Sequence, residues 1–150
     1  MSPLPTNRAI GTADPPADFN AVATQLNKGF IVPFFFDGNL VLGQGVARFR
    51  FPFAATLLGA TATINTPSAG ASVICDVDKI AGGGSGVGTT IFTTTGNRPT
   101  IAAAAYGTTT EPAPNVTAIA AGDVIKPRIS QIGSTTAGAD LTLEVRYELM

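Results

Sequence analysis

Apolar and polar residues alternate with a period of two along most of the chain from Phe30 onward. This alternation is typical of β-strands that bury one face and expose the other to water. The last segment, LTLEVRYEL, alternates without interruption. Its pattern predicts a closing strand whose inward side chains are Leu141, Leu143, Val145, Tyr147 and Leu149.

Eight earlier segments are also expected to be strands: FIVPFFF, the most apolar run of the chain, and then NLVLGQG, VARFRFPF, TLLGATATINT, ASVICDVDKI, TTIFTT, VTAIAA and VIKPRISQI. Asp37-Gly38 between the first two is a strong hairpin signal. In ASVICDVDKI we expect Asp76 and Asp78 to point outward into solvent. The other inward residues predicted from these patterns are Ala47, Phe49, Phe51, Phe53, Leu58, Ala60, Ala62, Ile64, Val73, Cys75 and Val77. About eight short strands joined by turns predict an all-β protein, an antiparallel β-sandwich.

The residues before Phe30 have a different pattern. Residues 1–16 hold four prolines, which donate no amide hydrogen bond, so we expect an extended arm there. A short helix follows, with Asp14 as its N-cap and Gly29 as its stop. One face of this helix carries Phe19, Val22 and Leu26.

A helix of about thirteen residues is marginal in water on its own, so this face needs a surface on which to pack. The chain is therefore expected to have two parts. Residues 1–29 are the arm and helix, used for attachment or oligomerisation, and residues 30–150 are the β-sandwich domain.

Composition narrows the functional classes. Charged residues make up 13% of the chain, about half the usual share, which favours a surface partly covered by a partner. The net charge of −1 gives no basis for binding nucleic acid. The chain has no histidine, so it lacks the commonest general base and metal ligand. Cys75, the single cysteine, lies among apolar residues and is expected to be a small buried side chain.

The remaining motifs favour structural roles. GGGSGVG, residues 82–88, lacks the lysine of a phosphate-binding loop and is expected to be a hairpin tip. Asp76 and Asp78 are two residues apart, but calcium needs six to eight oxygens from a wrapping loop. A paired-carboxylate glycosidase has no support in the spacing of the acids. We therefore expect no catalytic residue, no cofactor and no metal.

We expect neither a signal peptide nor a membrane-spanning segment in this sequence. The N-terminal residues have no apolar core of signal-peptide length. The most apolar run, Phe30–Phe36, is far too short to span a bilayer. The expectation is a protein made in a cytoplasm, without export and without a membrane partner.

Several of these segments resemble a module found in virion proteins of tailed bacteriophages. The matching features are Asp-x-x-Lys at residues 76–79, Thr-x-Ile-Phe at residues 89–92, Asn-Arg-Pro-x-Ile at residues 97–101, Ala-Gly-Asp at residues 121–123, and Gly-Ser-x-x-x-Gly-Ala-Asp-Leu at residues 133–141. ADFNAVATQLN resembles the short helix that often precedes such modules. The resemblance covers about Ala17 to Leu149. GGGSGVG departs from it, since the module has a shorter turn of the Asn-Gly kind there.

The resemblance implies a jelly-roll-like sandwich, usually trimeric, without catalysis. Within it we expect Asn97, Arg98 and Pro99 to form a turn from which Arg98 hydrogen-bonds across the sandwich. The alanines after Ile101 are expected to let backbones approach closely. We also expect a homotrimer, because closed symmetry leaves no open interface. Its predicted interface consists of Phe19, Val22, Leu26, Phe30, Phe34 and Phe36.

Two functional hypotheses follow from the resemblance. The first is a capsid decoration (cement) protein, assembled in the host cytoplasm and bound to the major capsid protein or another virion protein on the particle surface. The second is a tail-fibre or baseplate domain that binds host-surface glycans. Glycan sites usually expose aromatic side chains, and the two tyrosines, Tyr106 and Tyr147, are weak candidates for that role.

Overall fold

A computed structural model describes residues 29–84 and 86–150. The predicted arm and helix, with Phe19, Val22 and Leu26, lie outside these residues. The described part contains nine strands and two short 3-10 helices: β1 (Phe30–Asn39), β2 (Phe49–Arg50), β3 (Ala55–Thr66), β4 (Val73–Ile80), η1 (Ala81–Gly83), β5 (Thr89–Thr90), η2 (Thr95–Asn97), β6 (Thr100–Ile101), β7 (Ala118–Ile119), β8 (Val124–Gln131) and β9 (Ala139–Leu149).

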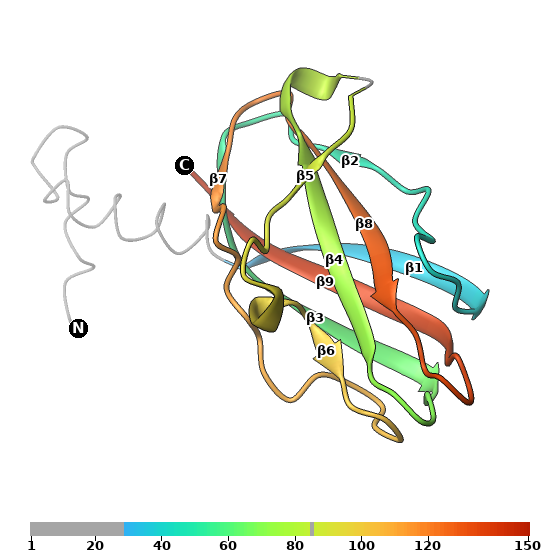
Figure 1. The fold of residues 1–150 in the computed structure, drawn as a ribbon. Coiled ribbons are helices and arrows are strands. Elements are labelled where there is room, and N and C mark those ends of the chain that lie inside the picture. Colours follow the sequence, from blue (N-terminus) through green and yellow to red (C-terminus); the bar gives the residue numbers. More distant parts are fainter. Residues whose placement is uncertain (1–28, 85) are drawn as a thin grey trace, which may run out of the picture.

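The strands form two antiparallel sheets that enclose the core (Figure 1). The first sheet has the order β1-β9-β3-β7. The second has the order β2-β8-β4-β5, and β6 also pairs with β4. The prediction of an all-β, antiparallel protein is therefore confirmed. The count differs from the expected eight, because nine strands are present and four of them are only two residues long.

The closing strand β9 lies in the middle of the first sheet, between β1 and β3. Its inward residues Leu141, Leu143 and Val145 are buried, as the alternation predicts. Tyr147 is partly buried, and its ring lies 5.5 Å from that of Phe30. The two ends of the domain therefore meet side by side, with Phe30 opposite Tyr147.

The prediction of a hairpin at Asp37-Gly38 is wrong. Strand β1 continues through both residues and stays paired with β9, and the register shifts by a bulge between Phe36 and Asn39. Gly38 supplies the left-handed conformation (φ +73°) that such a bulge requires. Residues 40–48, expected to hold a second strand, contain none.

A second bulge reverses one predicted face. In β3 the register against β9 shifts between Leu57 and Gly59, so Leu57 is buried where Leu58 was expected. Beyond the bulge the prediction is confirmed, since Ala60, Ala62 and Ile64 are all buried. A bulge adds one residue to one strand, and every side chain before it then points to the opposite face.

Strand β2 covers only Phe49–Arg50, which limits the alternation predicted for VARFRFPF. Phe51 is buried and Phe49 is partly buried, whereas Ala47 and Phe53 are exposed. The ring of Phe51 packs edge-on against Tyr147, with centroids 5.1 Å apart. This contact links the segment directly after β2, in one sheet, to β9 of the other.

Candidate functional site

The phenylalanines assigned to an oligomer interface lie mostly inside the domain. Phe34 and Phe36 are each 3% exposed and belong to the chain's own core, so they offer no surface to a partner. Phe30 is partly buried against Tyr147. The exposed apolar residues of β1 are instead Ile31 and Phe35.

The expected turn at Asn97, Arg98 and Pro99 is present at the end of η2. Arg98 Nε lies 3.0 Å from Asp76 Oδ2 on β4. Because β6, which follows this turn, pairs with β4 in the same sheet, Arg98 contacts a neighbouring strand and not the opposite sheet. Its role is to cover the outer face of the second sheet.

Asp76 is the centre of a charged cluster on that outer face. The expectation of a solvated carboxylate is wrong, since Asp76 is 0% exposed. Its Oδ1 accepts hydrogen bonds from the Val77 amide (2.8 Å) and the Thr90 hydroxyl (2.5 Å). Its Oδ2 lies 2.6 Å from Arg128 Nη2, and Arg128 Nε also donates to Asp78 Oδ2 at 3.0 Å.

This cluster is a structural clamp among three segments. Asp76 and Asp78 come from β4, Arg128 from β8, and Thr90 and Arg98 from the stretch that runs from β5 past η2. A buried carboxylate is strongly unfavourable unless cations and hydrogen bonds surround it, and here both are provided. Removing Asp76 would leave Arg98 without its carboxylate, and removing either arginine would leave the buried carboxylate with one cation fewer, so these segments depend on one another.

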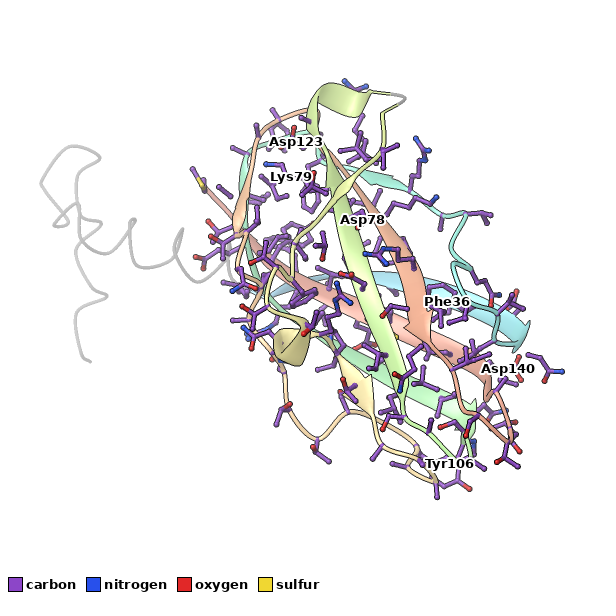
Figure 2. All side chains as sticks on the ribbon, in the orientation of Figure 1. Phe36, Asp78, Lys79, Tyr106, Asp123 and Asp140 are labelled. Atoms are coloured by element: carbon purple, nitrogen blue, oxygen red, sulfur yellow. The ribbon has the colours of Figure 1, made fainter. Side chains whose placement is uncertain are left out.

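Asp123 holds a second clamp at one end of the sandwich (Figure 2). Its carboxylate accepts hydrogen bonds from the amides of Gly82 (3.0 Å) and Ala120 (2.9 Å), and lies 3.0 Å from Lys79 Nζ. Burial raises the pKa of this carboxyl, but the two amides and the Lys79 ammonium outweigh burial and lower the pKa below its usual value. The charged form is therefore the one that the fold stabilises.

Cys75 is the buried side chain that its apolar surroundings predict. Burial, with a smaller contribution from the negative charge of Asp76, raises the pKa of its thiol to about 12. A thiol in this state is a poor nucleophile and metal ligand at neutral pH, because the thiolate is the reactive form. Among the described residues no group of three acidic or cysteine side chains is placed to hold a metal ion.

The surface has several shallow depressions. One of about 470 Å³ is lined by Arg50, Phe51, Pro52, Ala121 and Gly122. A second, of about 340 Å³, lies between Lys79 and Val116. A third, of about 220 Å³, is a groove beside β1, lined by Phe35, Val46 and Pro127 and also by the polar residues Asp37 and Gln44.

The two tyrosines do not form a common site. Tyr106 is exposed at the end of the sandwich opposite Asp123 (Figure 2). Tyr147 instead packs among Phe30, Phe49 and Phe51. Of the alanines after Ile101, the first three form an exposed turn, and Ala105 is partly buried against the core. Their backbone does approach a neighbouring segment closely, since the Ala104 amide donates to the Ser68 carbonyl at 2.9 Å.

Sequence reasoning missed two features: the burial of Asp76 and the exposed apolar face of β1. The first depends on residues distant in the chain, such as Arg128. The exposed apolar face of β1 could have been found from the uninterrupted apolar run FIVPFFF, because such a run is typical of a strand covered on both faces.

No helix within the described residues is long and apolar enough to cross a membrane. No family model, curated protein or solved structure matches the chain.

Proposed function

We propose that this chain is a non-catalytic structural component of a tailed-bacteriophage virion, a decoration protein with a jelly-roll-like module that binds the outside of the head. The observation that carries the proposal concerns the residues by which the sequence resembles such modules. Asp76 and Lys79 come from its Asp-x-x-Lys motif, Arg98 from Asn-Arg-Pro and Asp123 from Ala-Gly-Asp. These motifs are separate in the sequence but meet in the fold.

The charged motif residues contact one another. Asp76 pairs with Arg98, and Lys79 pairs with Asp123. The aspartate of the Gly-Ala-Asp-Leu motif, Asp140, accepts a hydrogen bond from the Gly38 amide at 2.7 Å, which fixes the bulge of β1. Each of these residues therefore acts in building the domain, as expected of a signature that defines a structural module and not a reaction centre.

A decoration protein stabilises a shell through contact surfaces, and the exposed apolar side chains of this domain are suited to that role. The partners in this proposal are further copies of the chain, as a homotrimer, and the major capsid protein or another virion protein. The chain binds no nucleic acid and needs no cofactor. Its location is the surface of the phage particle.

Immunogold labelling of purified virions with an antibody against the full-length protein tests the proposal. Label distributed over the head supports decoration. Label confined to the tail, or no label on purified particles, contradicts it. In a parallel test, the full-length protein is applied to host cells with free sugars as competitors. Saturable binding that sugars abolish would support the tail-fibre hypothesis instead, and Tyr106→Ser would be the first variant to compare.

A further inference from the structure

The outward face of β1 is an apolar surface with no cover among the described residues. Ile31, Pro33 and Phe35 alternate with the side chains that enter the core, and Ile31 and Phe35 are 52% and 68% exposed. Among the described strands, β1 lies at the edge of its sheet and has β9 as its single partner. A strand that is apolar on both faces is typical of one covered on both sides.

This surface extends beyond the strand. Phe35 also lines the groove of about 220 Å³ beside β1, together with Pro127 and with Val46, which is 95% exposed. The backbone edge of β1 is poorly suited to receive another strand, because Pro33 has no amide hydrogen and the bulge at Gly38 breaks the ladder. The face therefore suits side chains that pack over it, as those of an amphipathic segment do.

Such a segment is attached directly to this strand. Residues 1–28 end one residue before β1, and their sequence carries Phe19, Val22 and Leu26 at the spacing of one helical face. On a helix, Phe19 and Leu26 would be about 10 Å apart. Ile31 and Phe35 are separated by about 13 Å along a strand. The two apolar sets therefore match in length.

The short connection determines which copy supplies the segment. To lie on its own β1, the chain would have to reverse and rise by about 10 Å, the distance between packed layers. The helix expected from the sequence has Gly29 as its stop, which leaves this one residue as the connection to β1, and one residue spans at most about 3.6 Å. Connections between a helix and a strand that pack together usually need two to six residues. A segment from another molecule is free of this limit.

We propose that residues 17–28 of one copy pack on the outward face of β1 in a second copy, with Phe19, Val22 and Leu26 against Ile31 and Phe35. Each copy then both donates a segment and receives one. A closed ring of such exchanges covers every β1 face and leaves no free segment. This inference does not depend on a role in a virion, because it concerns only contacts between copies of this chain.

Sedimentation velocity of the full-length protein at micromolar concentration tests the contact from both sides. We expect the wild type to associate, and both Ile31→Ser/Phe35→Ser and Phe19→Ser/Leu26→Ser to raise the dissociation constant at least tenfold. Phe53→Ser is the matched control, because Phe53 is exposed to a similar degree away from β1. A monomeric wild type, or association that survives either double variant, would overturn the proposal.

Cross-linking identifies the donor of the segment. Leu26→Cys and Phe35→Cys are prepared as separate chains, mixed and treated with a short bismaleimide, while the buried Cys75 remains unmodified. The expected product is a heterodimer joined through positions 26 and 35, found by peptide mass spectrometry. In the double variant Leu26→Cys/Phe35→Cys, cross-links confined to single chains would show that the segment covers its own strand and would refute the exchange.

Discussion

Ala104 adopts a left-handed backbone conformation (φ +64°) in the turn after β6, where its amide donates to the Ser68 carbonyl. This conformation costs a residue with a Cβ about 1–2 kcal/mol. Ala104→Gly removes that strain, partly offset by the greater freedom of glycine in the unfolded chain. We expect the free energy of unfolding to rise by about 0.5–1 kcal/mol, measured by urea denaturation.

The neighbouring alanine is the control for this prediction. Ala103 is exposed in the same turn but does not have a positive φ. Ala103→Gly relieves no strain and only adds freedom to the unfolded chain, so it should lower stability by about 0.4–1 kcal/mol. If both substitutions shifted stability in the same direction, backbone strain at Ala104 would be excluded as the cause.

Asp123 makes stability depend on pH in a defined direction. Because its pKa is lowered in the folded state, the ionised form stabilises the fold at pH values above about 3.9, the usual value for aspartate. This contribution is lost as the pH falls through the lowered pKa. Asp123→Asn should cost about 1.5–3 kcal/mol at pH 7, since it weakens hydrogen bonds to a charged group.

Urea denaturation from pH 7 down to pH 2.5 measures this effect. The stability difference between wild type and Asp123→Asn should shrink below about pH 4, where the wild-type carboxylate takes up its proton. Asp37→Asn, at an exposed position, should stay within about 0.5 kcal/mol of wild type at pH 7. A difference between wild type and Asp123→Asn that is constant over the whole pH range would contradict the assigned role of the charge.

At the scale of elements, the Asp76 cluster should behave as a coupled unit. Asp76→Ala leaves Arg98 and Arg128 without their shared carboxylate and should cost about 3–5 kcal/mol. In a double-mutant cycle with Arg98→Ala, we expect a coupling energy of about 1–3 kcal/mol. Asp76→Asn, which keeps the side-chain volume, allows the same measurement if the alanine variant does not fold.

An exposed ion pair provides the comparison for this cycle. Arg146 Nε lies 2.6 Å from Glu111 Oε1, and both side chains are substantially accessible to water. Solvent screens such a pair, so its coupling energy should be about 0.2–1 kcal/mol. Equal couplings for the two pairs would show that the burial of Asp76 does not strengthen its contact with Arg98.

The elements that alternation predicts best are the long strands that pair without interruption. β9 follows the pattern of the sequence because each of its inward positions meets the same core. The predictions fail at the two bulges for one physical reason. Asp37-Gly38 has the composition of a turn, and the region of Leu57 has that of an ordinary strand. That each carries an extra residue is determined only by its pairing with β9.

The buried cluster could not be predicted for a related reason. Alternation places Asp76 on the outer face of β4, which is correct, but its burial comes from Thr90, Arg98 and Arg128, up to 52 residues away. Strand pairing places Arg128 directly opposite Asp76. The local sequence predicts to which face of a strand a side chain points. Whether that side chain is buried depends on the strand register and on segments distant in the sequence that pack over it.

At the scale of the whole molecule, the domain is closed by its own ends. β1 and β9 are the first and last described strands, and they are neighbours in one sheet. This pairing can form only when the rest of the chain is in place between them, so the domain should unfold as one cooperative unit. Cys75, a residue of β4 that is fully buried in the core, is placed to report on that transition.

Cys75 should react with a thiol reagent only when the whole sandwich opens. Its pKa of about 12 means that the folded state disfavours the thiolate, whereas an unfolded thiol ionises near pH 8.5. The corresponding stabilisation is fully present below about pH 8.5 and is lost as the pH rises above it. Cys75→Val has no thiol to ionise, so it should lose less stability than the wild type between pH 7 and pH 10.

At pH 8, labelling of Cys75 in the native protein with a chromogenic disulfide should be slow, and it should accelerate with urea along the slope for global unfolding. Fast labelling that is insensitive to urea would mean that β4 opens locally, and the clamps at Asp76 and Asp123 would then not hold β4 against its neighbouring segments.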